Sequence, residues 1–173
     1  MNYLHMRRAQ GFTLVELLIV IVVIAILAAI TLVTYSGMQE RSREAHIKSN
    51  LSELQKAIQG ARVSEGKTLR DITGSSYTAG PCAQKANDID LAELPESDVC
   101  WTRYSQTLGN ISEASGIDVR GLVDPWGRPY YIDENEGEGC NRDTIGAYTN
   151  PRNGSSRMLS VSIPSSEFSS LDC

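Results

Sequence analysis

The sequence contains few of the residues from which large cores and enzyme sites are built. It has two Phe, two Trp and two His among its 173 residues. So few Phe and Trp side chains leave material for a modest core, not for a large enzyme core. The chain has no G-x-S-x-G, P-loop, Rossmann or H-E-x-x-H motif. No histidine follows His46 to serve the many serines as a base, so the sequence predicts a protein that is not an enzyme.

C-x-x-C pairs are also lacking. The four cysteines are Cys82, Cys100, Cys140 and Cys173, and both histidines lie far from them in the sequence. This spacing argues against zinc. An even number of cysteines after an export-type segment indicates two disulfides in an oxidising compartment. Three pairings are possible, and the one that keeps both loops local joins Cys82 to Cys100 and Cys140 to Cys173.

Basic side chains are outnumbered. The chain has 16 Lys and Arg against 21 Asp and Glu, for a net charge of −5. Arg7 and Arg8 are the only charged side chains of the first eleven residues, so the remainder is more acidic still. Non-specific nucleic-acid binding depends on neutralising phosphates. Direct nucleic-acid binding is therefore not predicted.

One long apolar run is present, from Phe12 to Val33. As a helix it measures about 33 Å, which matches a hydrocarbon core of about 30 Å. Arg7 and Arg8 precede it, and the positive-inside rule then keeps the N-terminus in the cytoplasm. The run is longer than the apolar part of a cleaved signal peptide. The pattern predicts a single transmembrane helix with the rest of the chain outside.

Glu16 interrupts the start of this apolar run. A charge at the centre of a membrane helix costs roughly 2.5–3.5 kcal/mol on insertion scales. Three interpretations are open. Thr13 and Glu16 have the spacing of a capping box, or Glu16 lies at the level of the lipid headgroups. Alternatively, its carboxylate neutralises a new α-amine on a neighbouring chain, formed by cleavage just before Phe12.

The stretch Gly11-Phe12-Thr13-Leu14-Val15-Glu16-Leu17-Leu18-Ile19-Val20, behind two arginines, resembles the processing site of type IV prepilins and the related pseudopilins. The resemblance covers roughly the first 35 residues. It implies that a prepilin peptidase cuts between Gly11 and Phe12 and that Phe12 is then N-methylated. It also implies that Glu16 pairs with the N-terminus of an adjacent subunit. Many members have a proline where this chain has Val33, so the helix kink is not expected.

A second helical pattern follows the apolar run. Its apolar residues recur at spacings of three and four, as on one face of a helix: Ile47, Leu51, Leu54, Ile58 and Ala61. The two patterns together predict one nearly continuous helix of about 80 Å over residues 12–64. His46 has no metal-binding partner at helical spacing and is interpreted as a surface residue.

Strands are expected near the C-terminus. Residues 129–132, 144–148 and 158–163 alternate well enough for strands, and a turn at 124–127 separates the first from a candidate strand at 121–123. Short helical patches are expected at 90–94 and 104–114.

The fold class is α+β, a long N-terminal helix with a small antiparallel sheet, which the resemblance implies is the pilin fold. The predicted divisions are a leader at 1–11, a transmembrane and assembly helix at 12–35, and a head at 36–173, made of an amphipathic helix (36–64), a variable region (65–118) and a sheet region (119–173).

An acidic loop is the one candidate metal site. Asp133, Asn135 and Glu138 are candidate calcium ligands, because major pseudopilins bind calcium near this part of the sheet. Gly137 occupies a position where an EF-hand loop has a ligand. A solvated hairpin tip is therefore preferred, and no cofactor is predicted.

The resemblance implies a structural subunit of a type IV pilus-like filament for adhesion, motility or DNA uptake. Its partners would be identical or related pilin subunits, a prepilin peptidase and an inner-membrane assembly platform. The chain would be a single-pass precursor in the cytoplasmic membrane and then part of a surface filament. Two alternatives stay open. The stretch D-P-W-G-x-P-Y resembles a segment common in major pseudopilins of type II secretion and in related Gram-positive and environmental pilins. A single-pass anchored binding protein, the other alternative, need not polymerise at all.

Overall fold

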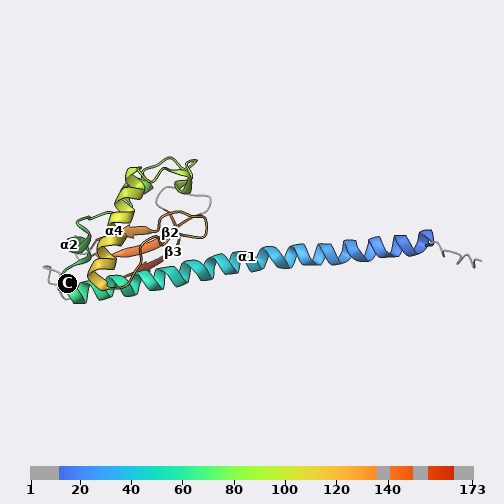
Figure 1. Cartoon of the computed structure of the whole chain (residues 1–173), viewed down its shortest axis with the longest axis horizontal. Coiled ribbons are helices and arrows are strands. Elements are labelled where there is room, and N and C mark those ends of the chain that lie inside the picture. The colour runs from blue at the N-terminus through green and yellow to red at the C-terminus, as the bar shows by residue number, and fades with distance from the viewer. Residues whose placement is uncertain (1–11, 136–140, 150–155, 166–173) are drawn as a thin grey trace, which may run out of the picture. The chain divides into compact units, whose positions relative to one another are not determined.

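The structure is a computed structural model that describes residues 12–135, 141–149 and 156–165, except for the side chains of residues 30–36. Its elements are α1 (Leu14–Glu65), α2 (Leu69–Thr73), α3 (Gly80–Ala83), a 3-10 helix η1 (Leu91–Glu93), α4 (Val99–Ser115), β1 (Tyr131–Asp133), β2 (Thr144–Tyr148) and β3 (Arg157–Ser162). The chain divides into two compact units, residues 1–42 and 43–173. We call the second unit the head (Figure 1).

The long helix predicted for residues 12–64 is confirmed as α1. It ends at Gly66, whose φ of 62° lies in the left-handed region where glycine carries no steric penalty. All five residues of the predicted apolar face are buried. His46, interpreted as a surface residue, is exposed.

The sheet has three strands in the order β1-β2-β3, and both pairings are antiparallel. This confirms the α+β fold class. The strands lie within two residues of the three predicted segments. Gly146 lies where β2 and β3 come close, and a Cβ atom there would lie 2.5 Å from the Leu159 carbonyl oxygen. Any side chain at this position would force the two strands apart.

A fourth strand, expected at 121–123, is absent from the part of the chain that the structure describes. The backbone carbonyls here bond side chains instead of a neighbouring strand. The Tyr104 hydroxyl donates to the Leu122 carbonyl at 2.7 Å, and the Asn50 amide donates to the Val123 carbonyl at 3.1 Å. A place beside a predicted turn therefore does not by itself indicate strand pairing.

The middle of the chain is more helical than expected. The predicted patch at 104–114 is part of α4, which begins five residues earlier because Asp98 caps it by accepting from the Cys100 amide at 2.9 Å. The patch at 90–94 is confirmed as η1. The helices α2 and α3 were not predicted, because four or five residues are too few to show a helical period.

The main core of the head lies among the second half of α1, α4 and the sheet. Ile47 and Leu54 come from α1, Leu108 from α4, and Ile132 and Ile145 from the sheet. A second cluster includes both Cys82 and Cys100 together with aromatic residues of β1 and β2. The second half of α1 and α4 therefore each bury an apolar face in a core that they share with the sheet.

Candidate assembly site on the N-terminal helix

The first turn of α1 is closed by a capping box. The Glu16 carboxylate oxygen Oε2 accepts from the Thr13 amide at 2.8 Å and from the Thr13 hydroxyl at 2.7 Å. In return, the Glu16 amide donates to the Thr13 hydroxyl oxygen at 3.3 Å. Of the three interpretations of Glu16, the local one is thus realised within a single chain.

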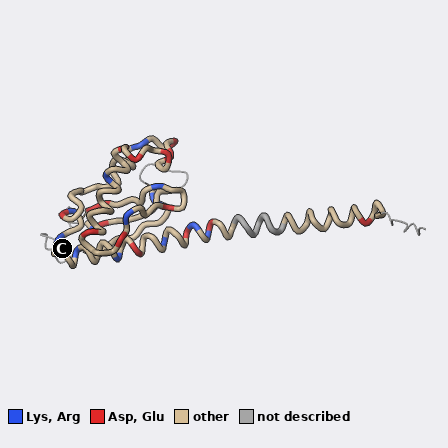
Figure 2. Tube along the Cα trace, viewed as in Figure 1, with Lys and Arg blue, Asp and Glu red and all other residues tan. Residues whose placement is uncertain are grey.

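The capping box leaves part of the carboxylate available. Both bonds from Thr13 end on Oε2, and within the described residues Oε1 of Glu16 accepts no hydrogen bond. Glu16 is also the only charged residue between Phe12 and Gln39, and this part of α1 is almost uncharged in Figure 2. A carboxylate with a free oxygen can accept from a second donor. Capping and pairing with another chain are therefore compatible.

The apolar side chains around Glu16 are exposed. Phe12 is 85% exposed and Leu14 is 83% exposed. The large apolar residues up to Leu27 are also exposed, each by about half or more. A continuous apolar surface of this kind marks contact with protein or membrane.

Within the described part of the chain, no helix meets the length and apolarity needed to cross a membrane.

Several predicted site residues cannot be placed. Arg7, Arg8 and Gly11 lie outside the described residues, as do Cys140, Cys173 and Glu138. The predicted transmembrane and assembly segment, residues 12–35, includes residues whose side chains are not described. The proposed cleavage bond is therefore described only on its Phe12 side.

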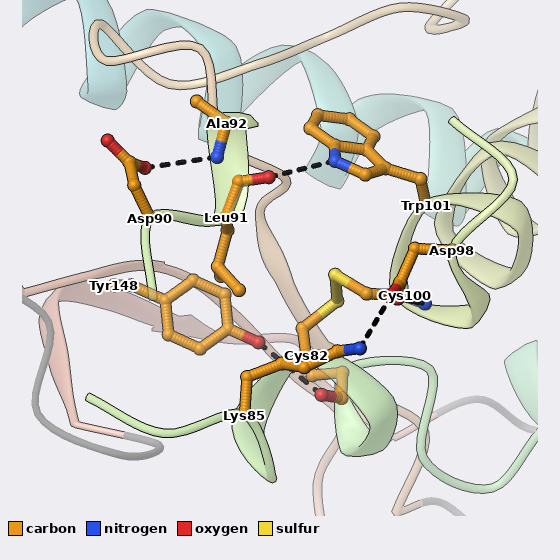
Figure 3. Close-up of a disulfide and its surroundings, with 10 residues drawn as sticks. Cys82, Lys85, Asp90, Leu91, Ala92, Asp98, Cys100, Trp101 and Tyr148 are labelled. Carbon is orange, nitrogen blue, oxygen red and sulfur yellow. Dashed lines mark hydrogen bonds and ion pairs between the residues drawn. A yellow bond between two sulfur atoms is a disulfide. The ribbon is translucent and has the colours of Figure 1, made fainter. Parts of the chain in front are cut away.

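One predicted disulfide is present in the head. Cys82 of α3 and Cys100 of α4 are bonded, with their Cα atoms 4.7 Å apart (Figure 3). Beside it, the Lys85 ammonium lies 2.6 Å from the Asp98 carboxylate. Both cysteines are buried, so this disulfide is part of the core. In the chain-entropy model, a disulfide that closes the loop from Cys82 to Cys100 stabilises the folded state by roughly 3 kcal/mol.

The calcium candidates that can be seen have other partners. Asp133 accepts a hydrogen bond from the Tyr131 hydroxyl at 3.0 Å, and the Asn135 amide donates to the Arg142 carbonyl at 3.4 Å. Among residues 12–135, 141–149 and 156–165, no three acidic, His or Cys side chains gather as a metal site would need. Glu138 lies outside these ranges.

Buried charges in the head were missed by the sequence analysis. Arg62 at the end of α1 pairs with Asp143, and both are almost fully buried. Arg62 follows Ile58 by four residues, so its place on the apolar face was a signal. Arg128 pairs with Asp124 at 2.7 Å inside the D-P-W-G turn. The predicted turn itself is confirmed by the Gly127 amide, which donates to the Asp124 carbonyl at 2.9 Å.

Glu134 follows β1 and is fully buried, and among the residues that the structure describes no cationic side chain pairs with it. Its carboxylate accepts from the Thr78 amide at 2.8 Å and from the Thr78 hydroxyl. The Thr78 hydroxyl is also 2.8 Å from that of Thr107. Burial raises the pKa of Glu134 to about 7, although the hydrogen bonds from Thr78 oppose the rise. No spacing in the sequence marks Glu134, because its neighbours come from distant segments.

Comparisons with known proteins agree with these features. A family model described as "Prokaryotic N-terminal methylation motif" matches residues 6–32. A type IV major alpha-pilin from Moraxella bovis is 41% identical over 117 residues, covering 61% of this chain and 72% of the relative. The type IV wide pilus major component PilA4 of Thermus thermophilus is 35% identical over 78 residues, covering 45% of this chain and 53% of the relative.

A third relative matches only the N-terminal part. The type IV major pilin protein PilA of Myxococcus xanthus is 47% identical over 47 residues, covering 27% of this chain and 21% of the relative. The chain thus spans about a fifth of the myxococcal relative and about half of the Thermus one. No solved structure matches it significantly. A methylation motif overlaps the start of a helix whose apolar residues are exposed, and the head has a small antiparallel sheet. The match to the alpha-pilin covers most of that relative's length. The chain therefore belongs to the type IV pilin family.

Proposed function

We propose that this chain is the precursor of a structural subunit that assembles through α1 into a type IV pilus-like filament. The supporting observation is the exposed apolar surface of residues 12–29, which carries Glu16 as its one charge. Such a surface is costly in water and is stabilised when other helices or lipid cover it. The chain acts by assembly and catalyses no reaction.

The precursor is inserted in the cytoplasmic membrane and cut between Gly11 and Phe12. A prepilin peptidase makes the cut, and the new Phe12 amine is methylated. Phe12 lies just before the first turn of α1, so the scissile bond precedes the helix. Residues 1–11 are the leader, 12–35 the anchor and assembly helix, and 36–173 the periplasmic or extracellular part that contains the head.

Glu16 sets the register between subunits. Its Oε2 closes the first turn with Thr13, and its Oε1 accepts from the Phe12 amine of a neighbouring subunit. A carboxylate and an ammonium attract strongly where water is excluded. Apolar burial between helices supplies cohesion, and this pair selects one axial position. An inner-membrane assembly platform delivers the subunits, and the finished filament lies at the cell surface.

The test is the fate of a Glu16→Gln variant in the native host. We expect normal insertion and a normal mature N-terminus by mass spectrometry, with filaments lost from sheared-cell fractions. Glu40→Gln is the matched control, since Glu40 is an exposed acid just beyond the apolar stretch. Wild-type amounts of filament from Glu16→Gln would leave the capping box as the only role of this residue.

A second candidate is the major pseudopilin of a type II secretion system. The D-P-W-G turn favours it, because this stretch resembles a segment common in major pseudopilins, and here it packs against α1 in the head. The Trp126 ring lies under the Arg43 guanidinium, 5.6 Å from the ring centroid, and the Arg128 guanidinium lies at 4.9 Å. Deleting the gene distinguishes the two roles. Loss of surface filaments, adhesion, motility or DNA uptake supports the pilus, and loss of protein secretion supports the pseudopilus.

A further inference from the structure

The head has an open hollow whose walls are α3, α4 and the loop after α2. Its volume is about 850 Å³. Polar side chains from all three walls line it, among them Tyr77, Gln84, Lys85, Arg103, Gln106 and Thr107. Apolar ligands prefer pockets lined by hydrophobic side chains. The lining of this hollow instead offers hydroxyls, amides and cations.

The walls of the hollow are fixed to each other before any ligand arrives. The Cys82–Cys100 disulfide joins α3 to α4, and the ion pair between Lys85 and Asp98 at 2.6 Å spans the same gap (Figure 3). The third wall is held by an aromatic contact, since the Tyr77 ring lies edge-on to that of Tyr131 with centroids 5.8 Å apart. Ligands bind more tightly to a site whose parts need no ordering.

The charge of the hollow is opposite to that of the protein. Its lining contains Lys85 and Arg103 and no carboxylate, in a chain whose net charge is −5. Lys85 is already paired with Asp98. Arg103 is exposed and forms no ion pair with the residues that the structure describes. One available guanidinium suits one carboxylate, which it binds through two parallel hydrogen bonds.

We propose that this hollow binds an acidic saccharide. Its carboxylate pairs with Arg103, and its hydroxyls bond the amides of Gln84 and Gln106. The Tyr77 ring provides an amphipathic wall for the face of a sugar ring. A polyphosphate or nucleic acid is disfavoured, because binding a polyanion requires several unpaired cations. The site belongs to the head, and the inference does not depend on filament assembly.

The experiment is calorimetric titration of the full chain in detergent micelles at low salt. The probes are trigalacturonate, 3′-sialyllactose, neutral lactose and a hexaglutamate peptide. We expect at least one acidic saccharide to bind roughly tenfold or more tightly than lactose and hexaglutamate. Preference for trigalacturonate identifies a uronate ligand, and preference for sialyllactose identifies a sialate.

Two variants locate the binding. Arg103→Gln is expected to weaken binding of the acidic saccharide roughly tenfold or more, because it removes a charge-assisted pair. Arg120→Gln removes the same charge from an exposed arginine outside the hollow and should change binding less than twofold. Circular dichroism checks that both variants keep the fold. The proposal is overturned if no acidic saccharide binds, if hexaglutamate binds as tightly, or if Arg103→Gln binds like the native chain.

Discussion

The N-terminal half of α1 and the head each hold one carboxylate in the same way, in opposite surroundings. Glu16 accepts from the amide and hydroxyl of Thr13, and Glu134 accepts from the amide and hydroxyl of Thr78. Thr13 is three residues from its acid in the sequence, whereas Thr78 is 56 residues away. Glu16 is exposed and Glu134 is fully buried. The first site is complete in an isolated helix, and the second exists only in the folded head.

The same contrast applies to apolar side chains. Leu18 of α1 is 53% exposed, and Leu54 of the same helix is fully buried against the sheet. Residues on every side of the first half are apolar, whereas the second half has one apolar face and a charged one. The head satisfies its apolar surface within one chain. The N-terminal half leaves that surface for other molecules, which is why we infer assembly.

The largest expected effect is on removal of the leader, and it comes from changing the residue before the cut. Gly11→Ala should block processing, because the resemblance places the cut directly after this glycine. Mass spectrometry of membrane fractions should find the chain intact from Met1 and no filaments. Ala9→Ser, two residues upstream, is the control and should be processed normally. A normal mature N-terminus in Gly11→Ala would contradict the assigned cleavage site.

Breaking a buried charge pair should have the next largest effect. Asp143→Ala leaves the Arg62 guanidinium buried without its carboxylate. Such a loss typically costs 3–5 kcal/mol of the free energy of unfolding. Denaturant unfolding of the full chain in detergent measures it. Glu113→Ala, which removes an exposed partner of Arg120, should cost less than about 1 kcal/mol. Equal effects of the two variants would contradict the burial of the Arg62–Asp143 pair.

Matched leucines sharpen the comparison between the two halves of α1. Leu54→Ala should lower the free energy of unfolding of the head by about 2–5 kcal/mol, because it leaves a cavity in the core. Leu18→Ala should leave head stability within about 0.5 kcal/mol, since Leu18 is exposed in the single chain. Its expected effect is on filament yield instead. A head destabilised by Leu18→Ala would mean that the two halves are coupled within one chain.

The smallest expected effect is the change of the free energy of unfolding with pH. Because burial raises the pKa of Glu134 to about 7, the folded head keeps this proton while the unfolded chain loses it from about pH 4.5 upward. The free energy of unfolding should therefore fall as pH rises from about 4.5 to about 7, by at most roughly 3 kcal/mol. Glu134→Gln should flatten this part of the profile, and Glu113→Gln should not. A native profile that is flat or rising in this window would contradict the raised pKa.

Periodicity predicted α1 and its buried face well, because a helix places residues three and four apart on one side. The turn at 124–127 was predictable for a similar reason, since proline and glycine suit fixed turn positions. The strand expected at 121–123 was wrong. The turn indicates where the chain reverses, and it does not report whether a neighbouring strand is present to accept hydrogen bonds. Here Asn50 and Tyr104 occupy that place.

The sequence by itself determined the parts of this protein that depend on near neighbours. These are the long helix, the capping box at Thr13 and Glu16, and the processing motif around Gly11, all of which are written within a few residues. Only the tertiary structure decided that Glu134 accepts a hydrogen bond from Thr78 and that Arg62 forms an ion pair with Asp143. It also decided that α3, α4 and the loop after α2 form a polar hollow beside the Cys82–Cys100 disulfide. The physical reason is that burial and pairing arise when distant segments pack together, and local patterns carry no record of which segment will be the partner.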